Sequence, residues 1–174
     1  MDGYYVGLTT TDAVYINGKL TVKGDMTGPT AANIVLRDPS VDLAVLETAR
    51  GGILRAGLGY PQCDVGAVLN VSSDHLGLGG IDTLEQLAVV KRLLLEVTRD
   101  TAVINADDPI CMEMVPHTTA KRLCFVSMDP KNPVIQKQKD EEKRAVVLEE
   151  DDHGEVIVLY DKGRRIVVTR PRLI

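Results

Sequence analysis

The sequence predicts an α/β fold built on a mainly parallel sheet that is flanked by helices. The main observation behind that prediction is a set of three apolar runs, 41–47 (VDLAVLE), 64–71 (DVGAVLNV) and 101–105 (TAVIN). Runs of this length suit parallel strands that are covered on both faces. Helical patterns separate the runs and a β-rich segment closes the chain, as in an α/β fold. The 174 residues, 44% of them hydrophobic, suit one domain, which we expect over 1–174.

The first forty residues predict a strand, a hairpin and a helix. Residues 4–9 (YYVGLT) are typical of a short buried strand. Residues 13–22 (AVYINGKLTV) hold two β-rich runs that are joined by Asn17 and Gly18, a pair that favours a two-residue hairpin turn. Residues 28–38 (GPTAANIVLRD) follow with a proline that is well placed for the first turn of a helix.

The longest helix is expected in 81–99 (IDTLEQLAVVKRLLLEVTR). Asp82 is the expected N-cap, with Glu85 three residues later in the capping-box position. A second, shorter helix is expected in 107–115 (DDPICMEMV). These helices would lie between successive strands and cover the sheet.

The C-terminal part returns to strands. Residues 121–127 (KRLCFVS) predict a strand, and 128–144 is polar and is expected to be an exposed connector. Three short β-rich runs separated by DDHG and DKG then predict an antiparallel β-meander over 145–170.

Composition excludes several functions. A net charge of −5, an aromatic content of 3% and the absence of Trp argue against nucleic acid or an anionic membrane as the main partner. No apolar run approaches the roughly 18 residues of a membrane span, and the first residues lack the layout of a signal peptide. The three cysteines are odd in number and match no metal spacing, which predicts reduced thiols in a cytoplasmic protein.

Polar residues stand where three predicted strands end. Glu47 ends the first run, Asn70 opens a loop that carries Asp74 and His75, and Asn105 ends the third run. If these strands are neighbours, all three ends face the crevice where open α/β sheets bind ligands. Carboxylate and imidazole groups can ligate a divalent cation there. Each group also has a structural explanation as a solvated turn acid, a polar loop or a helix cap.

Lys91 lies on the apolar side of the long helix. At about 100° per residue it falls among leucines and an alanine, and an unpaired ammonium in such a place is costly. Its stem could extend to the surface, it could pair with a buried acid, or its pKa could fall so that the neutral amine reacts, for example with carbon dioxide. The apolar neighbours are Leu84, Leu87, Ala88, Leu94 and Leu95.

Common nucleotide and hydrolase motifs are missing. The chain has no G-x-x-x-x-G-K-[ST] loop and no G-x-S-x-G element. Residues 57–62 (GLGYPQ) and 77–82 (GLGGID) start like a dinucleotide loop, but both lack its last glycine and its strand–turn–helix context. A Rossmann dehydrogenase is therefore not expected.

Three motifs, in this order and spacing, carry a resemblance to a known family: LETARGGILRAGLGY (46–60), NVSSDHLGLGGIDTLEQLAVVKR (70–92) and INADDP (104–109). They resemble the central ATPase domain of the Mur ligase superfamily. The front of the chain, 5–29, is similar to the members of that superfamily that join arginine to aspartate side chains of a growing polymer. The resemblance covers nearly the whole chain and weakens after about residue 130.

The resemblance implies a role for several residues in metal binding and catalysis. Glu47 would hold magnesium beside the nucleotide phosphates, and His75 would ligate a second magnesium ion. Lys91 matches a lysine that many members carbamylate to hold that second ion. Asn70 and Asp74 would be catalytic pocket residues.

The same resemblance implies residues that bind the other reactants. Thr27 and Gly28 match a loop near the metals and the acyl substrate. Arg50 suits an anionic group of substrate or phosphate, and Asn105 and Asp107 would contact the ATP cofactor.

The implied reaction forms an acyl phosphate from ATP and a carboxylate, after which an amine displaces phosphate. The family's phosphate loop, of the form G-T-N-G-K-T-T, and its C-terminal domain have no match in these 174 residues. We therefore expect a partial central domain that is inactive alone and needs the remaining ligase domains or a second copy. A catalytically inactive module that serves binding or assembly is the alternative hypothesis.

Overall fold

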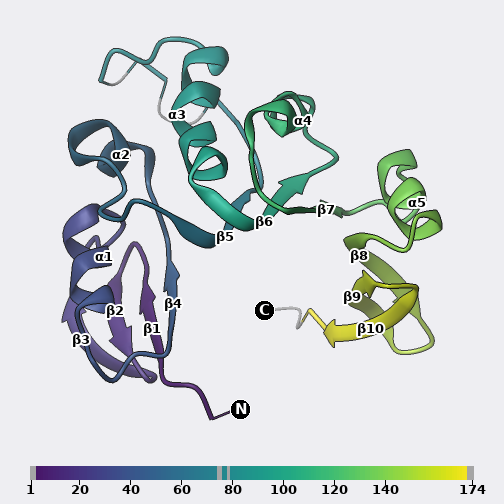
Figure 1. Cartoon of the computed structure of the whole chain (residues 1–174), viewed down its shortest axis with the longest axis horizontal. Coiled ribbons are helices and arrows are strands. Elements are labelled where there is room, and N and C mark those ends of the chain that lie inside the picture. The colour runs from purple at the N-terminus through teal and green to yellow at the C-terminus, as the bar shows by residue number, and fades with distance from the viewer. Residues whose placement is uncertain (1–2, 74–75, 78, 172–174) are drawn as a thin grey trace. The chain divides into compact units, whose positions relative to one another are not determined.

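A computed structural model describes residues 3–73, 76–77 and 79–171, which fall into two compact units (Figure 1). The first unit contains the chain up to Pro61 together with 77–81, and the second contains 62–76 and the chain from Asp82 onward. That both units belong to one domain stays a prediction. None of the helices in the described ranges is long and apolar enough to span a membrane.

The first unit holds a four-stranded sheet in the order β3-β2-β1-β4, in which β1 is parallel to β4 and antiparallel to β2. The predicted hairpin is confirmed: Asn17 (φ 48°) and Gly18 (φ 75°) both adopt the left-handed conformation that a tight turn between β2 and β3 requires. The elements are β1 (Val6–Thr9), β2 (Ala13–Ile16), β3 (Lys19–Lys23), α1 (Pro29–Leu36), β4 (Leu43–Leu46) and α2 (Arg50–Ala56).

Helix α1 packs on this sheet through a small apolar core. Val14 of β2 packs with Ala31 and Val35 of α1. Gly7 of β1 permits the close approach, because a Cβ there would lie 2.3 Å from Cγ1 of Val35.

The second unit holds a six-stranded sheet in the order β10-β9-β8-β7-β6-β5. Strands β5, β6, β7 and β8 run parallel to one another. Strands β8, β9 and β10 form the predicted antiparallel meander. The elements are β5 (Cys63–Val68), α3 (Leu84–Glu96), β6 (Thr98–Asn105), α4 (Pro109–Glu113), the 3₁₀ turn η1 (Val115–His117), β7 (Arg122–Ser127), α5 (Pro133–Asp140), β8 (Arg144–Asp151), β9 (Gly154–Asp161) and β10 (Arg164–Thr169).

The strand ends that carry polar residues are distributed over both sheets. Strands β5 and β6 are neighbours as expected, but β4 pairs with β1 in the first unit. Strand β4 also exposes Leu43 (51%) and Val45 (49%), so within this strand only Ala44 and Leu46 are partly covered.

The N-cap of α3 lies one residue later than predicted. Thr83, and not Asp82, is the N-cap, and its hydroxyl accepts a hydrogen bond from the backbone N–H of Gln86 at 3.3 Å. The Gln86 side chain returns the bond to the N–H of Thr83 at 3.2 Å. The sequence DTLEQ satisfies the capping-box pattern in both registers, which is why sequence alone selected the wrong one.

Two further boundaries differ from expectation. Thr98 and Arg99, expected in the long helix, begin β6, because α3 ends at Glu96. The expected connector 128–144 contains α5, whose Ile135 is fully buried. A single buried isoleucine in a polar stretch gives too weak a periodic signal to reveal a helix.

Candidate functional site

Glu47 follows β4 and is exposed to solvent. One of its carboxylate oxygens, Oε2, accepts a hydrogen bond from the backbone N–H of Thr11 at 3.0 Å. Its own N–H continues the parallel ladder to the carbonyl of Thr9 at 3.3 Å. The strand end thus fixes the Glu47 backbone and presents a carboxylate outside the sheet.

The predicted substrate loop at Thr27 and Gly28 packs against the start of α2. Ala49, the N-cap of α2, donates its N–H to the carbonyl of Thr27 at 3.1 Å. Gly52 comes so close that a Cβ would lie 3.0 Å from Cα of Gly28. The glycines of ARGG therefore allow a close backbone contact, and Arg50, the first residue of α2, starts its helix beside this loop.

Asp25 orders the same loop. Its Oδ1 accepts hydrogen bonds from the hydroxyl of the buried Thr27 at 2.7 Å and from the Thr27 N–H at 3.3 Å. These bonds, the side-chain bond foremost, hold the pKa of Asp25 below its ordinary value. Four predicted site residues thus belong to the first unit, and they follow β4 or precede α1: Thr27, Gly28, Glu47 and Arg50.

In the second unit, Lys91 of α3 forms hydrogen bonds with Asn70, which follows the end of β5. Its ammonium donates to the backbone carbonyl of Asn70 at 2.8 Å and to the side-chain oxygen of the same residue at 3.4 Å. Of the three outcomes weighed from sequence, pairing with a buried acid is not seen among the described residues, while both hydrogen bonds of the ammonium lie in an exposed position, which fits a stem that extends toward the surface. Reaction of the amine with carbon dioxide stays a prediction. Lys91 is partly buried on the helix side that also buries Leu87 and Leu95, and it caps a strand end.

Two more side chains bind the residues on either side of Asn70. Asn105, at the end of β6, donates from Nδ2 to the carbonyl of Leu69 at 2.8 Å. Asp108 accepts the backbone N–H of Val71 at 2.8 Å. The three residues after β5, which are Leu69, Asn70 and Val71, are therefore each bound by a side chain from another element: β6, α3 and the N-cap of α4.

Asp108 is the residue of this cluster that the sequence-based prediction did not include. It is the N-cap of α4, and its Oδ1 accepts the N–H groups of Ile110 at 2.9 Å and Cys111 at 3.2 Å. Burial alone would raise its pKa, but the bonds from Val71, Cys111 and Ile110 outweigh burial and lower it. An Asp directly before a proline at the first helical position is a usable cap signal.

Asp107, the predicted nucleotide contact, forms hydrogen bonds with the segment after β7. It accepts from the hydroxyl of Ser127 at 2.6 Å, the N–H of Met128 at 2.7 Å and Nδ2 of Asn132 at 2.9 Å. Burial would raise its pKa, and these three bonds lower it below the ordinary value. Its role toward ATP stays a prediction.

Two predicted residues, Asp74 and His75, lie outside the described residues. Among the residues that are described, no group of three His, Cys, Asp or Glu side chains is placed to hold a metal ion. None of the three cysteines forms a disulfide, in keeping with the predicted thiols. Burial raises the pKa of Cys111 to about 12 and that of Cys124 to about 11, so neither thiol is suited to act as a nucleophile.

The sequence profile of the Mur ligase middle domain matches residues 5–169. The chain belongs to the Mur ligase middle-domain family. Two curated relatives are cyanophycin synthetases: one from Synechocystis sp., 58% identical over 136 residues, and one from Geminocystis herdmanii, 46% identical over 173 residues. The matches cover 77% and 96% of this chain but 16% and 20% of those proteins, so the chain spans at most about a fifth of their length.

A solved Mur ligase has the same fold. The structure of a UDP-N-acetylmuramoyl-L-alanyl-D-glutamate–2,6-diaminopimelate ligase matches with a TM-score of 0.68 and 20% identity, over 95% of this chain and 33% of that one. The resemblance inferred from the three sequence motifs is confirmed. Within this Mur ligase middle-domain chain, the described candidate residues form one group in each unit.

Proposed function

We propose that this chain forms part of an ATP-dependent amide ligase of the cyanophycin synthetase type. The observation that carries the proposal is the 58% identity over 136 residues to such an enzyme. In the proposed reaction, ATP transfers its terminal phosphoryl group to an aspartate side-chain carboxylate, which leaves ADP. The α-amine of arginine then attacks the acyl carbon, loses a proton and displaces phosphate, which forms the amide. The protein would act in the cytoplasm.

The end of β4 offers one carboxylate, that of Glu47, to a magnesium ion. The Glu47 carboxylate is exposed, and its Oε2 accepts a hydrogen bond from the backbone N–H of Thr11. Mg²⁺ in nucleotide sites is usually held by one or two carboxylates, phosphate oxygens and water. Glu47 would hold one ion and His75 a second. Bound magnesium would stabilise charge on the transferring phosphoryl group.

Lys91 is proposed as the carbamylated lysine. Its neutral amine would add to carbon dioxide and lose a proton, which gives a carbamate with one remaining N–H. That N–H could still donate to the carbonyl of Asn70, now 2.8 Å from Nζ, while the carbamate oxygens would supply a ligand for the second metal ion. The loop that carries Asn70 and Asp74 would thereby be held in place next to the second metal.

The remaining residues would bind the reactants. Thr27 and Gly28 would contact the acyl substrate from the loop that packs on α2. Arg50 would bind an anionic group, and Asn105 with Asp107 would border the nucleotide. In this role Asn105 also keeps the strand end in position through its bond to Leu69.

Calorimetric titration of MgATP into the protein that carries this sequence tests the proposal. Wild type is expected to bind, and Glu47→Ala and His75→Ala are expected to weaken binding at least tenfold. The control Glu155→Ala, an exposed acid on β9, should bind like wild type. Equal binding by Glu47→Ala and wild type would contradict the magnesium role. An absence of binding by every form would favour the alternative, an inactive module that serves assembly.

A further inference from the structure

Two charged side chains bind the two sides of a single peptide group after β5. The Asn70 carbonyl accepts a hydrogen bond from the ammonium of Lys91 at 2.8 Å, and the Val71 N–H donates to Oδ2 of Asp108 at 2.8 Å. This carbonyl and this N–H belong to the same peptide unit, the 70–71 peptide group. They point in opposite directions because the peptide is trans. Lys91 and Asp108 therefore lie on opposite sides of the 70–71 peptide group.

Both contacts strengthen the polarity that a peptide group already has. The carbonyl oxygen carries a partial negative charge and faces a cation here, whereas the N–H carries a partial positive charge and faces a carboxylate. Hydrogen bonds with one ionised partner are about twice as strong as neutral ones. Hydrogen bonds at both ends of one polar group polarise it and so strengthen each other. The charges of Lys91 and Asp108 are thus coupled through the 70–71 peptide group.

The two carboxylate oxygens of Asp108 have separate partners. Oδ1 accepts the N–H groups of Ile110 and Cys111 and so caps α4, while Oδ2 accepts the N–H of Val71. A helix cap needs only one of these oxygens, and a serine would serve as well. Val71 is only 6% exposed, so its N–H depends on a protein acceptor. The second oxygen therefore joins α4 to the 70–71 peptide group.

The planar peptide carries this orientation to the side of Lys91. Because the atoms of a peptide group lie in one plane, fixing the direction of the Val71 N–H also fixes that of the Asn70 carbonyl, which binds Nζ of Lys91. The preceding peptide group is bound as well, since the Leu69 carbonyl accepts from Asn105 at 2.8 Å. Asn70 is thus fixed at both of its peptide groups. This sets the direction of its side chain, whose Oδ1 lies 3.4 Å from Nζ of Lys91.

We propose that Asp108 is a positioning residue of the ligase site, which acts on Asn70 and Lys91 through the 70–71 peptide group. The proposal rests on the proposed function, in which the Lys91 amine becomes a carbamate and Asn70 lies in the catalytic pocket. An ammonium and a carbamate nitrogen can both donate to the Asn70 carbonyl, so the direction set by Asp108 serves both states of Lys91. The Asp108 carboxylate is occupied by three backbone N–H groups and takes no part in the reaction itself.

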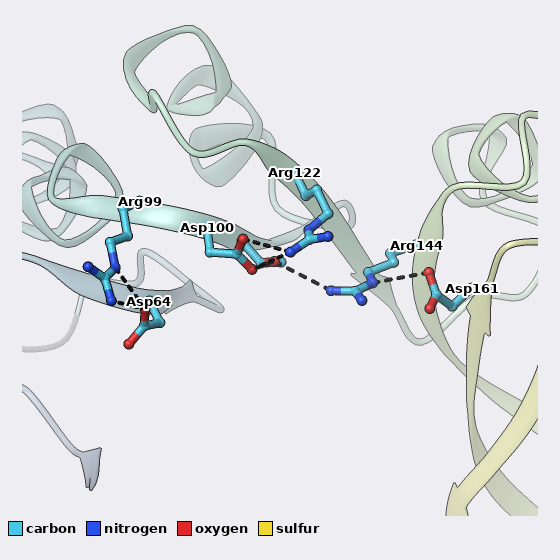
Figure 2. A network of polar contacts seen from close by, with 7 residues as sticks. Asp64, Arg99, Asp100, Arg122, Arg144 and Asp161 are labelled. Carbon is cyan, nitrogen blue, oxygen red and sulfur yellow. Dashed lines mark hydrogen bonds and ion pairs between the residues drawn. The ribbon is translucent and has the colours of Figure 1, made fainter. Parts of the chain in front are cut away.

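An ion pair at the other end of the same sheet provides a matched control. Figure 2 shows Arg122, the first residue of β7, whose guanidinium donates to both carboxylate oxygens of Asp100, at 2.6 and 2.8 Å. These charges bind each other directly, with no peptide group between them. Asp100 lies near the start of β6, whereas Asn105 ends that strand beside the 70–71 peptide group. Removing the Arg122 charge therefore leaves the 70–71 peptide group untouched.

The NMR resonance of the Val71 amide proton, recorded on the whole chain in buffer without bicarbonate, tests the coupling. In Asp108→Ser the serine can cap α4, but the carboxylate at Val71 is lost. This variant and Lys91→Met should both shift the Val71 amide proton upfield, the second although Lys91 binds only the carbonyl side of the peptide group. Arg122→Met should leave the resonance in place. An unchanged Val71 resonance in Lys91→Met would contradict the coupling.

A double-variant cycle measures the same coupling by urea unfolding. If the two contacts are coupled, the double variant Lys91→Met with Asp108→Ser should raise the unfolding equilibrium constant about fivefold less than the product of the two single effects. Arg122→Met with Asp108→Ser should give the plain product, because these residues share no partner. A plain product for the Lys91 and Asp108 pair as well would overturn the coupling.

Arginine incorporation into an aspartate polymer tests the positioning role. Asp108→Ser should lower kcat about tenfold or more, because the reacting groups are misplaced, and should leave KM for MgATP unchanged, because Asn105 and Asp107 are retained. Equal kcat values for Asp108→Ser and wild type would refute the positioning role. Without turnover by wild type, the ligase function fails and the positioning role with it, whereas the coupling is decided by the Val71 resonance alone.

Discussion

At the scale of single residues, Lys91 shows what helical periodicity can and cannot predict. The pattern placed it correctly on the apolar side of its helix, because Leu87 and Leu95 on that side are buried. It could not supply the partner, which is the carbonyl of Asn70, 21 residues away in sequence. Because Lys91 contacts the residue that follows β5, a carbamate on Lys91 would lie next to Asn70, as the proposed function requires.

Asp108 illustrates a different limit. The motif INADDP offers two aspartates in succession, and although the proline after Asp108 marks it as a helix cap, nothing in the motif shows which distant segment each aspartate binds. The structure assigns Asp108 to the loop after β5 through Val71, and Asp107 to the segment after β7 through Ser127 and Met128. Long-range hydrogen bonds of this kind depend on the strand order, which is not encoded in a local motif.

The lowered pKa of Asp108 predicts a pH dependence of stability. Its pKa is lower in the folded protein than its ordinary value of about 4. The stabilisation is therefore complete above that ordinary value and is lost as the pH falls through the folded pKa. Urea unfolding of wild type should show a free energy that declines below about pH 4, and Asp108→Asn should be less stable near neutral pH and show a smaller decline.

The control for this measurement is Asp152→Asn, an exposed acid in the turn after β8. It should reproduce the stability of wild type at every pH. If Asp108→Asn declined as steeply as wild type, the three backbone hydrogen bonds to Asp108 would not be the source of the pH dependence.

At the scale of elements, boundaries were harder to predict than the elements themselves. Most helices and strands were found, including the Asn17-Gly18 hairpin, because their signals are local. The start of α3 was displaced by one residue because Asp82 and Thr83 both suit an N-cap. Helix α5 was missed because only two of its residues, Ile135 and Gln138, are buried.

The register of the α3 cap is testable by stability. Thr83→Ala should lower the free energy of unfolding by about 1 kcal/mol, because it leaves the N–H of Gln86 without its acceptor. The Asp82 side chain forms no hydrogen bond with the described residues, so Asp82→Ala should change stability by less than about 0.5 kcal/mol. Urea denaturation of the two variants measures both values. The opposite order of effects would restore Asp82 as the cap.

At the scale of the whole molecule, sequence predicted the α/β class but not the division into two units. The apolar runs 41–47 and 64–71 look alike, yet β4 pairs with β1 and β5 pairs with β6. Strand partners are set by contacts between distant segments, so composition cannot reveal them. The resemblance of the three motifs predicted the family as well as the fold class. The match of the Mur ligase middle domain over residues 5–169 confirms that prediction.

The candidate site was predicted unevenly at this scale. The sequence placed Glu47, Asn70 and Asn105 at or after strand ends and Lys91 on the apolar side of its helix, and the structure has these residues in those places. Their roles in a ligase site stay predictions. The link between Lys91 and Asp108 was not predicted. It runs through a peptide group from a third segment of the chain, and no local motif joins the three segments.

The central claim, that this chain serves an ATP-dependent amide ligase, is tested most directly by incorporation of labelled arginine into an aspartate polymer. The protein that carries this sequence should form one ADP for each amide bond. Lys91→Ala should lower the rate by roughly 100-fold or more, the usual effect of losing one electrostatic contact to the reacting groups. Lys137→Ala, an exposed lysine on α5, should keep the wild-type rate. ADP formation without arginine incorporation, or a Lys91→Ala rate equal to wild type, would contradict the account.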